Sequence, residues 1–152
     1  MSISVRLKAL LDENKIPFSV ISHQTTYTAQ GTAATMQISA KELAKTVVVW
    51  AGEEMILAVL PGPRHVKLHK LAAEVGRSVR LASEQEFGSH FSDCEPGAMP
   101  PIGSLYNLPV YVDESLADDE EIVFNAGTHH DAIRMRYDDF VRLVKPKICS
   151  FT

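Results

Sequence analysis

The sequence predicts an α+β fold, in which helices and strands are mixed without the regular strand–helix–strand alternation of a parallel α/β protein. Amphipathic helical patterns stand near both ends of the chain, and two apolar runs of strand length flank a short glycine-containing turn. The length of 152 residues is close to the commonest size of one domain, and the 45% apolar content is enough for a core. We therefore expect residues 1–152 to form a single domain.

The N-terminal third alternates helical and extended patterns. Apolar residues at helical spacing include Leu7 and Leu11, whereas Pro17 favours extended chain after the first helix. Ser39 followed by Glu42 is a capping-box pattern, which marks a helix start. The predicted elements are a helix ending near Asn14, a strand at Phe18–Ser22, a helix from Thr28 to about Met36, and a short helix beginning at Ser39.

A β-hairpin is the clearest local prediction. The run Thr46–Trp50 is rich in β-branched residues, and a second apolar run follows at Met55–Leu60. The polar segment Gly52–Glu54 between them is short enough to turn the chain back on itself. Pro61–Pro63, with glycine between the two prolines, ends the second strand sharply.

The remainder of the chain continues the mixture. Gly76 is placed to end a helix, and Ser83 with Glu86 forms a second capping box. The proline- and glycine-rich stretch Ser92–Leu108 cannot be regular, and a long loop inside a compact domain is more often functional than accidental. The predicted elements are helices at Leu68–Val75, from Ser83 through Phe91 and at Asp138–Val144, and strands at Ser78–Ala82, Pro109–Val112, Glu121–Phe124 and Ala132–Met135.

Composition and charge narrow the function classes. The net charge of −4 argues against a general nucleic-acid binder, including a DNA-binding protein. Basic residues outnumber acids between Lys41 and Arg80, whereas Glu84–Glu121 holds ten acids and no Lys or Arg. One part of the surface suits phosphates and another does not, although a merely solvated dipolar surface fits equally well. We see no signal peptide and no membrane span, so we expect a soluble cytoplasmic protein.

Lys45 is the first candidate functional residue. It stands at the junction between a short predicted helix and an apolar strand, where burying an ammonium is costly without an anionic partner. The competing interpretation is a lysine that extends its head from a strand end into water, which is common.

The segment Gly97–Gly103 is the second candidate. Its prolines fix the backbone and its terminal glycines allow a ligand to approach closely, so it can present rigid amide and carbonyl groups. The competing interpretation is a plain connector.

Metal and nucleophile chemistry receive little support. His65 and His69 stand four apart in a predicted helix, and His129 and His130 are adjacent, yet neither pair has a third ligand at a recognised spacing. Structural or exposed histidines are therefore expected, with no metal and no cofactor. Serine-nucleophile motifs are absent, and Cys94 is interpreted as a small apolar filler.

Several short segments follow one another in a specific order. They are His23, Thr28-Ala29 and Ala34, then Leu43-Ala44-Lys45-Thr46-Val47-Val48, Val59-Leu60-Pro61-Gly62, Gly97-Ala98-Met99-Pro100-Pro101-Ile102-Gly103 and Phe124-Asn125-Ala126-Gly127. Taken together, these segments resemble the YbaK family, which is also described as the aminoacyl-tRNA deacylase or prolyl-tRNA-synthetase-associated editing domain. The resemblance extends over almost the whole chain, and its lysine motif and G-x-x-x-P loop are jointly specific.

The resemblance implies a mixed, partly barrel-like sheet flanked by helices, and hydrolysis of the aminoacyl ester at the 3′ end of a mischarged tRNA. It carries the family's key lysine onto Lys45 and the loop onto Gly97 and Pro101. An aminoacyl-tRNA synthetase is a possible further partner. The substrate-binding set is predicted to be His23, Thr28, Thr46, Ala98, Met99, Pro100, Ile102, Gly103 and Gly127.

The hypothesis for the mechanism is electrostatic. An aminoacyl ester is already activated, so positioning and charge stabilisation suffice without a protein nucleophile. Lys45 would hold a phosphate or the ester carbonyl, amides of the loop would stabilise the oxyanion, and water or a group of the substrate would attack. A non-catalytic binder of the tRNA acceptor end, a small-molecule-binding domain and a metal-dependent hydrolase remain alternatives.

Overall fold

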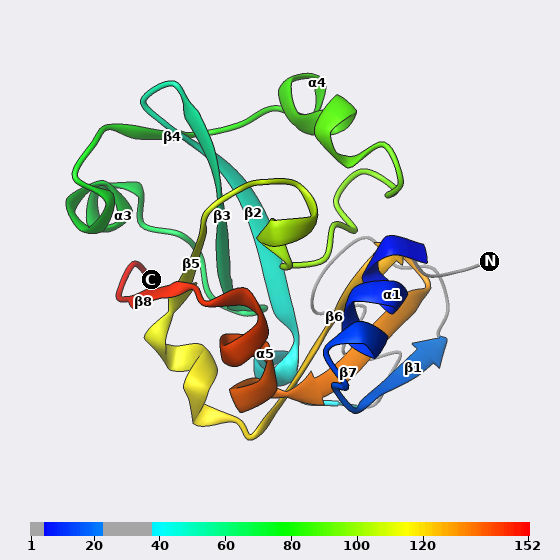
Figure 1. Cartoon of the computed structure of the whole chain (residues 1–152). Coiled ribbons are helices and arrows are strands. Elements are labelled where there is room, and N and C mark those ends of the chain that lie inside the picture. The colour runs from blue at the N-terminus through cyan, green and yellow to red at the C-terminus, as the bar shows by residue number, and fades with distance from the viewer. Residues whose placement is uncertain (1–4, 23–37) are drawn as a thin grey trace.

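Two β-sheets share one central core in the part of the chain that the computed structural model describes, residues 5–22 and 38–152 (Figure 1). The smaller sheet has the strand order β1-β7-β6, and the larger has the order β4-β2-β3-β5-β8. The strands are β1 (Phe18–Ser22), β2 (Ala44–Ala51), β3 (Glu54–Pro61), β4 (Val79–Leu81), β5 (Val110–Asp113), β6 (Glu121–Thr128), β7 (Asp131–Arg136) and β8 (Lys147–Cys149).

Helices cover the sheets, and short 3-10 helices connect the elements. No helix in the described residues is long and apolar enough to cross a membrane. The α-helices are α1 (Val5–Glu13), α3 (Leu68–Val75), α4 (Glu84–Phe87) and α5 (Tyr137–Val144), and the 3-10 helices are η1 (Ala40–Glu42), η2 (Gly88–Phe91), η3 (Gly103–Leu105) and η4 (Glu114–Asp118).

The hairpin of β2 and β3 is the centre of the larger sheet. The two strands pair antiparallel from Ala44 opposite Pro61 to Ala51 opposite Glu54, so Gly52 and Glu53 alone form the turn. Gly52 has φ +60°, a left-handed conformation that glycine adopts without steric cost. β5 lies parallel to β3, and β8 lies parallel to β5.

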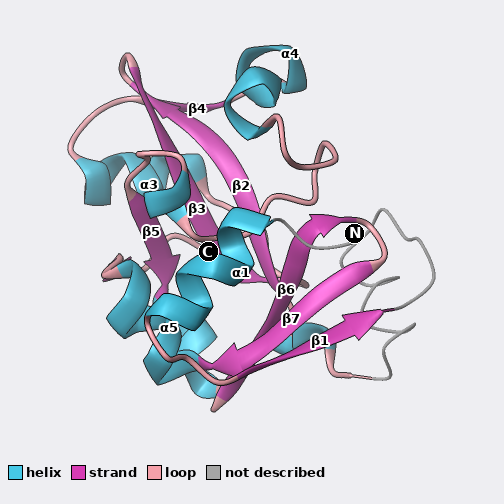
Figure 2. Cartoon of the chain, turned by 45° about the vertical axis from the view of Figure 1, so that its right-hand side comes forward, coloured by secondary structure: helices cyan, strands magenta, loops and turns pink. Residues whose placement is uncertain are grey.

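The two faces of this hairpin bury different partners because side chains alternate along a strand. Ala44 and Val48 of β2 point into the central core, which also contains Leu7 and Leu11 of α1. Figure 2 shows α1 lying across the smaller sheet, which contributes the other side of this core. The opposite face of the hairpin, which includes Val49, packs against α3.

β6 is the edge strand of the smaller sheet, and it is also where the two sheets meet. Leu43, directly before β2, forms an isolated parallel bridge with Val123 of β6. From that bridge, β2 and β6 diverge, as Figure 1 shows. The α+β prediction is confirmed, and the strands of the described residues form two sheets that do not close into a barrel.

Most predicted elements are present, with shifted ends. Gly76 ends α3 in a left-handed conformation with φ +81°, and the capping box of Ser83 and Glu86 is formed at α4. The short helix predicted from Ser39 is present as the 3-10 helix η1, because β2 begins at Ala44 and leaves no room for an α-helix. The Ser39 hydroxyl accepts from the amide of Lys41 rather than from that of Glu42. The helix predicted between Thr28 and Met36 lies outside the described residues.

Two further differences concern the C-terminal half. The strand predicted to end at Phe124 continues to Thr128, and β8 was not predicted at all. The predicted helix through Phe91 is a single α-helical turn followed by η2.

Asp113, at the end of β5, fastens the C-terminal segment to the larger sheet. Its side chain is 1% exposed and accepts hydrogen bonds from the amides of Phe151 (2.9 Å) and Ser115 (3.1 Å). The hydroxyls of Ser115 and Thr152 also donate to it. Burial alone would raise the pKa of Asp113, but these donors together hold it below its ordinary value.

Replacing Asp113 with Asn tests this fastening. Because the amide offers one acceptor oxygen fewer to several donors, we expect a loss of about 1–3 kcal/mol of unfolding free energy at pH 7, measured by urea denaturation. A lowered folded-state pKa stabilises the protein above the unfolded pKa of about 4, and this contribution disappears as pH falls through the folded value. The difference in unfolding free energy between the wild type and Asp113→Asn should therefore be smaller at pH 3 than at pH 7. An equal gap at pH 7 and pH 3 would contradict the assignment.

Candidate functional site

Two segments attach to the outer side of β6, and they define the candidate site. Leu43 bridges to Val123, and the segment preceding Gly97 binds at Gly127, where the amide of Glu95 donates to the Gly127 carbonyl at 2.7 Å. The amide of Gly127 in turn donates to the carbonyl of Ala98 at 3.0 Å. Val123 and Gly127 are four positions apart in the strand, a span of about 13 Å.

Lys45 emerges beside the first attachment. It is the second residue of β2, opposite Leu60 of β3, and alternation directs it to the face opposite Ala44 and Val48. That is the face of Leu43, which packs with Val123 rather than in the central core. The predicted lysine therefore stands at the junction of the two sheets.

The environment of Lys45 is poorly solvated and without a counter-charge. The side chain is part-buried, and burial lowers the pKa of Lys45 below the ordinary lysine value. Within residues 5–22 and 38–152 its ammonium makes no ion pair and no hydrogen bond. A partly desolvated cation without a partner among the described residues is expected to bind an anion or a strongly polarised oxygen.

The second attachment is a clamp between the G-x-x-x-P loop and the β6–β7 hairpin. In addition to the two backbone bonds at Gly127, the amide of His129 donates to the Glu95 carboxylate at 2.7 Å. The imidazole Nε2 of His129 lies 2.6 Å from the carbonyl oxygen of Pro96. Gly127 is free for these bonds because β6 bulges between Asn125 and Thr128 and leaves it unpaired with β7.

The same hairpin is fixed internally by Asp131, which is 1% exposed. The hydroxyls of Thr128 (2.7 Å) and Ser22 (3.1 Å) donate to its carboxylate. His130 is exposed and lies 3.0 Å from the same carboxylate. The hairpin end that holds the loop is therefore itself tied to β1.

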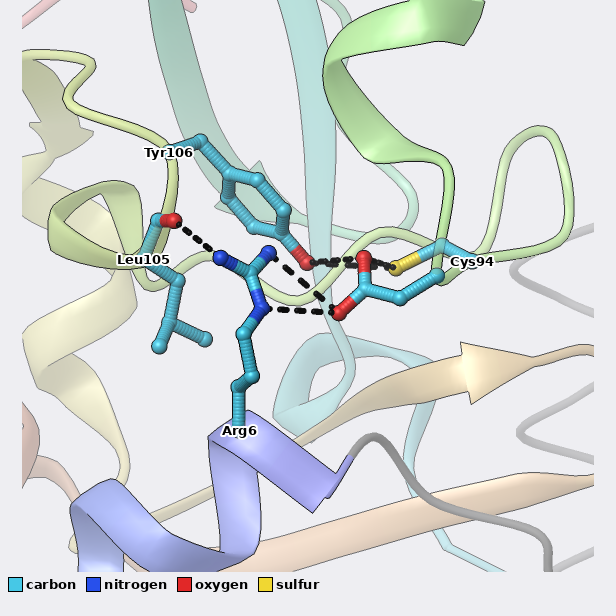
Figure 3. A network of polar contacts seen from close by, with 5 residues as sticks. Arg6, Cys94, Leu105 and Tyr106 are labelled. Carbon is cyan, nitrogen blue, oxygen red and sulfur yellow. Dashed lines mark hydrogen bonds and ion pairs between the residues drawn. The ribbon is translucent and has the colours of Figure 1, made fainter.

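A polar network fastens the loop a second time, to α1 (Figure 3). Arg6 contacts the Asp93 carboxylate at 3.3 Å and donates to the carbonyl of Leu105 at 2.9 Å. The Arg6 guanidinium also lies over the ring of Tyr106, whose hydroxyl donates to Asp93 at 3.2 Å. The loop is thus held on both sides of Gly97–Gly103, and its conformation is set before any ligand arrives.

Cys94 belongs to this network. Its thiol lies 3.2 Å from the Tyr106 hydroxyl and 3.5 Å from the Asp93 carboxylate. Burial raises the pKa of the Cys94 thiol to about 11, so the reactive thiolate is scarce at neutral pH. The thiol is a packed donor or acceptor rather than a nucleophile, close to the filler role that the sequence predicted.

The two glycines that bound the loop have different requirements. Gly97 is exposed with φ +84°, and a Cβ there would lie 3.4 Å from the His129 ring. Gly103 is buried, and a Cβ there would lie 2.2 Å from the Leu108 carbonyl oxygen. Gly97 therefore presents its backbone outward, whereas glycine at position 103 is demanded by packing against the chain that leads into β5.

The other predicted loop residues face inward. The residues from Ala98 to Ile102 are all buried, and the side chains of Met99 and Ile102 belong to the central core. Pro100 and Pro101 have no amide hydrogen, and the amide of Ala98 already donates to Glu95. Within the described part of the chain, the loop amides of Gly97, Met99, Ile102 and Gly103 donate no hydrogen bond, and of these four residues Gly97 alone is exposed, so Gly97 is the exposed donor that the loop offers. The substrate-binding assignments of the buried residues stay predictions.

Thr46 and the N-terminal candidates complete the set. Thr46 is part-buried opposite Val59 and lies on the central-core side of β2, away from the face of Lys45. His23 and Thr28 lie outside the described residues. The structure thus attaches two segments to the same strand, β6: Leu43, which lies two residues before Lys45, and the G-x-x-x-P loop.

Sequence reasoning missed two side chains at this strand. His129 was given no role, although it stands only two residues after Gly127, the last residue of a quoted motif. Asn125 lies between the two attachments on β6, and its side-chain oxygen Oδ1 is buried without a hydrogen-bond partner in the described structure. The positions of His129 and Asn125 relative to the loop could not be predicted, because the predicted strand ended at Phe124 whereas β6 continues to Thr128.

Metal ligation finds no support in the described residues, where no three His, Cys, Asp or Glu side chains gather to hold an ion. The expected pairing of His65 and His69 on one helix is wrong, because α3 begins at Leu68 and His65 precedes it.

Comparisons with known proteins agree on one family. The profile of the aminoacyl-tRNA editing domain matches residues 23–143. The chain is 26% identical to the multifunctional Ser/Thr-tRNA deacylase ProXp-y of Escherichia coli K12, over 96% of this chain and 90% of that protein. It is also 33% identical to a proline–tRNA ligase of Thiobacillus denitrificans, over 66% of this chain and 18% of the ligase.

Solved structures show the same fold. A crystal structure described as a proposed trans-editing enzyme for prolyl tRNA synthetase superposes with a TM-score of 0.84 at 22% identity, covering 99% of both chains. The hypothetical protein APE2540 superposes with a TM-score of 0.88 at 19% identity, covering 96% of this chain and 98% of that one.

The pKa of Cys94 gives a direct test of this part of the site. Burial also raises the pKa of Cys149 to about 11, so both thiols should resist alkylation. With iodoacetamide at pH 7.5 we expect each to react about two orders of magnitude more slowly than in the urea-unfolded chain, because a free cysteine has a pKa of about 8.5. Mass spectrometry of tryptic peptides separates the two sites. Alkylation of native Cys94 at the unfolded rate would mean that the Asp93–Tyr106 network is not formed.

Proposed function

The chain belongs to the aminoacyl-tRNA editing domain family, and on that basis we propose that it deacylates mischarged tRNA by cleaving the aminoacyl ester at the tRNA 3′ end. The family named from the sequence motifs is the one that the profile matches. The curated relative of similar length is a Ser/Thr-tRNA deacylase, which supports a hydrolase acting in trans. Charged tRNA is the substrate class, and we propose a cytoplasmic location where charged tRNAs are used.

The observation that carries the proposal is the state of Lys45. A part-buried ammonium without a partner in the described residues favours binding of an anion or a polarised oxygen. A charged lysine at a strand end that served only stability would be expected to reach water or a carboxylate. The 3′ end of a charged tRNA brings both the phosphate of the terminal nucleotide and the ester carbonyl.

The proposed chemistry uses charge and positioning only. Lys45 binds the terminal phosphate or the ester carbonyl, and the exposed amide of Gly97 donates to the carbonyl oxygen as it becomes an oxyanion. Water adds to the carbonyl carbon, and the tetrahedral intermediate collapses with release of the amino acid and the ribose hydroxyl of the tRNA. The fixed loop keeps the Gly97 donor in place, so that little reorganisation accompanies the reaction.

The spacing of the two attachments on β6 is comparable to the length of an aminoacylated terminal adenosine. The Leu43 and Gly127 attachments are separated by about 13 Å along β6, and a lysine side chain spans about half of that distance. A terminal adenosine with its aminoacyl group extends over a comparable length. We therefore propose that the terminal nucleotide lies toward Lys45 and the ester toward Gly97.

Recognition beyond the acceptor end is part of the same proposal. The relative found within a proline–tRNA ligase aligns over 102 residues, so editing domains of this kind also occur inside a synthetase. We propose a synthetase as a partner that supplies mischarged tRNA.

A non-catalytic tRNA acceptor-end binder is the second candidate, because an unpaired lysine would also suit a bound phosphate. The assay that separates the two uses a panel of tRNAs mischarged with small amino acids, including serine and threonine. Release of free amino acid with turnover supports the deacylase, whereas protection of the ester in a stable complex supports the binder.

Replacing Lys45 with Ala tests the central role. Removing one electrostatic donor typically costs about 10²–10³-fold in rate, so we expect kcat/KM for the best mischarged tRNA to fall by about that factor. Lys8→Ala is the matched control, because Lys8 is an exposed lysine of α1 that pairs with Asp12 on the same helix. A Lys45→Ala protein that deacylates the whole panel at the wild-type rate would refute the assignment.

A further inference from the structure

We propose that His129 is a positioning residue of the deacylation site, which acts by holding the Gly97 amide in place rather than by touching the substrate. The inference rests on the proposed function, since it assigns a residue to that reaction. It comes from the contacts between the β6–β7 hairpin and the segment that leads into Gly97.

Two hydrogen bonds of His129 bind consecutive residues of the segment that leads into Gly97. Its amide donates to the carboxylate of Glu95 at 2.7 Å, and its ring nitrogen Nε2 lies 2.6 Å from the carbonyl oxygen of Pro96. A carbonyl oxygen can only accept, so Nε2 carries the proton and donates. Both the backbone and the side chain of one residue therefore determine how the chain enters Gly97.

The ring also controls the conformation of Gly97 itself. Gly97 has φ +84°, and its Cα approaches the imidazole so closely that a Cβ would lie 3.4 Å from Cε1. The peptide between Pro96 and Gly97 has its carbonyl bound to His129, and the amide of the same peptide is the exposed donor of the loop. Fixing the carbonyl of a planar peptide fixes the direction of its N–H.

The clamp is rigid because His129 is well supported. The imidazole is buried, with 7% of the residue exposed. The preceding residue, Thr128, is tied to Asp131, because its hydroxyl donates to that buried carboxylate at 2.7 Å, and Asp131 is in turn tied to Ser22 of β1. A displacement of about 1 Å at a catalytic donor can cost about 10²-fold in rate, so loss of the clamp has a large expected effect.

The alternative is that His129 only stabilises the fold. A purely structural role would lower stability and leave the turnover of the folded fraction unchanged. A positioning role lowers kcat in the folded protein and leaves KM nearly unchanged, because the tRNA would still be bound through other contacts.

The experiment compares His129→Ala with His129→Gln in single-turnover and steady-state deacylation of mischarged tRNA. Glutamine can place its amide nitrogen near the position of Nε2, so it restores the donor to the Pro96 carbonyl. We expect kcat to fall about 10²-fold for the alanine variant, with KM changed less than about threefold. The glutamine variant should recover to within about tenfold of wild type.

Two further variants separate an effect on the clamp from a general effect of mutating this hairpin. Glu95→Ala removes the other half of the clamp from an exposed position, and it should also lower kcat with little change in melting temperature. His130→Ala is the matched control, since His130 is the adjacent, exposed histidine and its side chain contacts Asp131 rather than the loop, so kcat of this variant should stay at the wild-type value.

A measurement independent of activity separates this proposal from the proposed function. The Ala98 and Gly127 amides both hydrogen-bond within the clamp, so their hydrogen exchange should speed up at least about tenfold in His129→Ala and not in His130→Ala. If the wild-type protein has no deacylase activity, the proposed function is refuted. The hydrogen-exchange rates of Ala98 and Gly127 still test whether His129 holds the loop. Unchanged exchange, or a folded His129→Ala protein with wild-type kcat, overturns the role of His129.

Discussion

The backbone of β6 carries the rest of the structure. As an edge strand it pairs with β7 on one side, and its other side receives the start of β2 at Val123 and the G-x-x-x-P loop at Gly127. An open strand edge leaves amide and carbonyl groups that must find partners, and here both partners bring candidate functional groups. Lys45 follows the first attachment by two residues, and Gly97 lies inside the second. The hydrogen bonding of one strand edge thus attaches both the chain that leads into Lys45 and the loop that contains Gly97.

The two candidate groups owe their availability to opposite circumstances. Lys45 is available because the described residues around it remove water without supplying an anion, which leaves its charge uncompensated. The Gly97 amide is available because its neighbours are fully committed: the loop is held by His129, Glu95 and the Arg6 network, and its other side chains are buried. Such a site is costly to fold, and it requires little movement when the ligand arrives.

The sequence predicted those features that depend on neighbours in the chain. The β2–β3 hairpin, the capping box at Ser83 and the stop at Gly76 are encoded within a few residues, and all three are present. β8 and the extension of β6 to Thr128 were missed, because short strands arise from pairing with distant segments rather than from local pattern. The role of His129 was hidden for the same reason, since its partners lie more than thirty positions earlier. The family motifs identified Lys45 and the loop, yet they could not distinguish Gly97, which presents its backbone, from Gly103, which fills a packing constraint.

The account depends on Lys45 and the Gly97 amide binding one and the same ligand. The most direct measurement is an NMR titration of the labelled protein with a hydrolysis-resistant 3′-aminoacylamino-adenosine 5′-phosphate, following the backbone amides and the lysine side-chain signals. The account predicts that the Gly97 amide and the Lys45 side chain shift together and saturate at the same ligand concentration. The account is contradicted if, at saturation, the signals of residues lining the cleft between Lys41 and Arg64 have shifted while the signals of Lys45 and Gly97 have not.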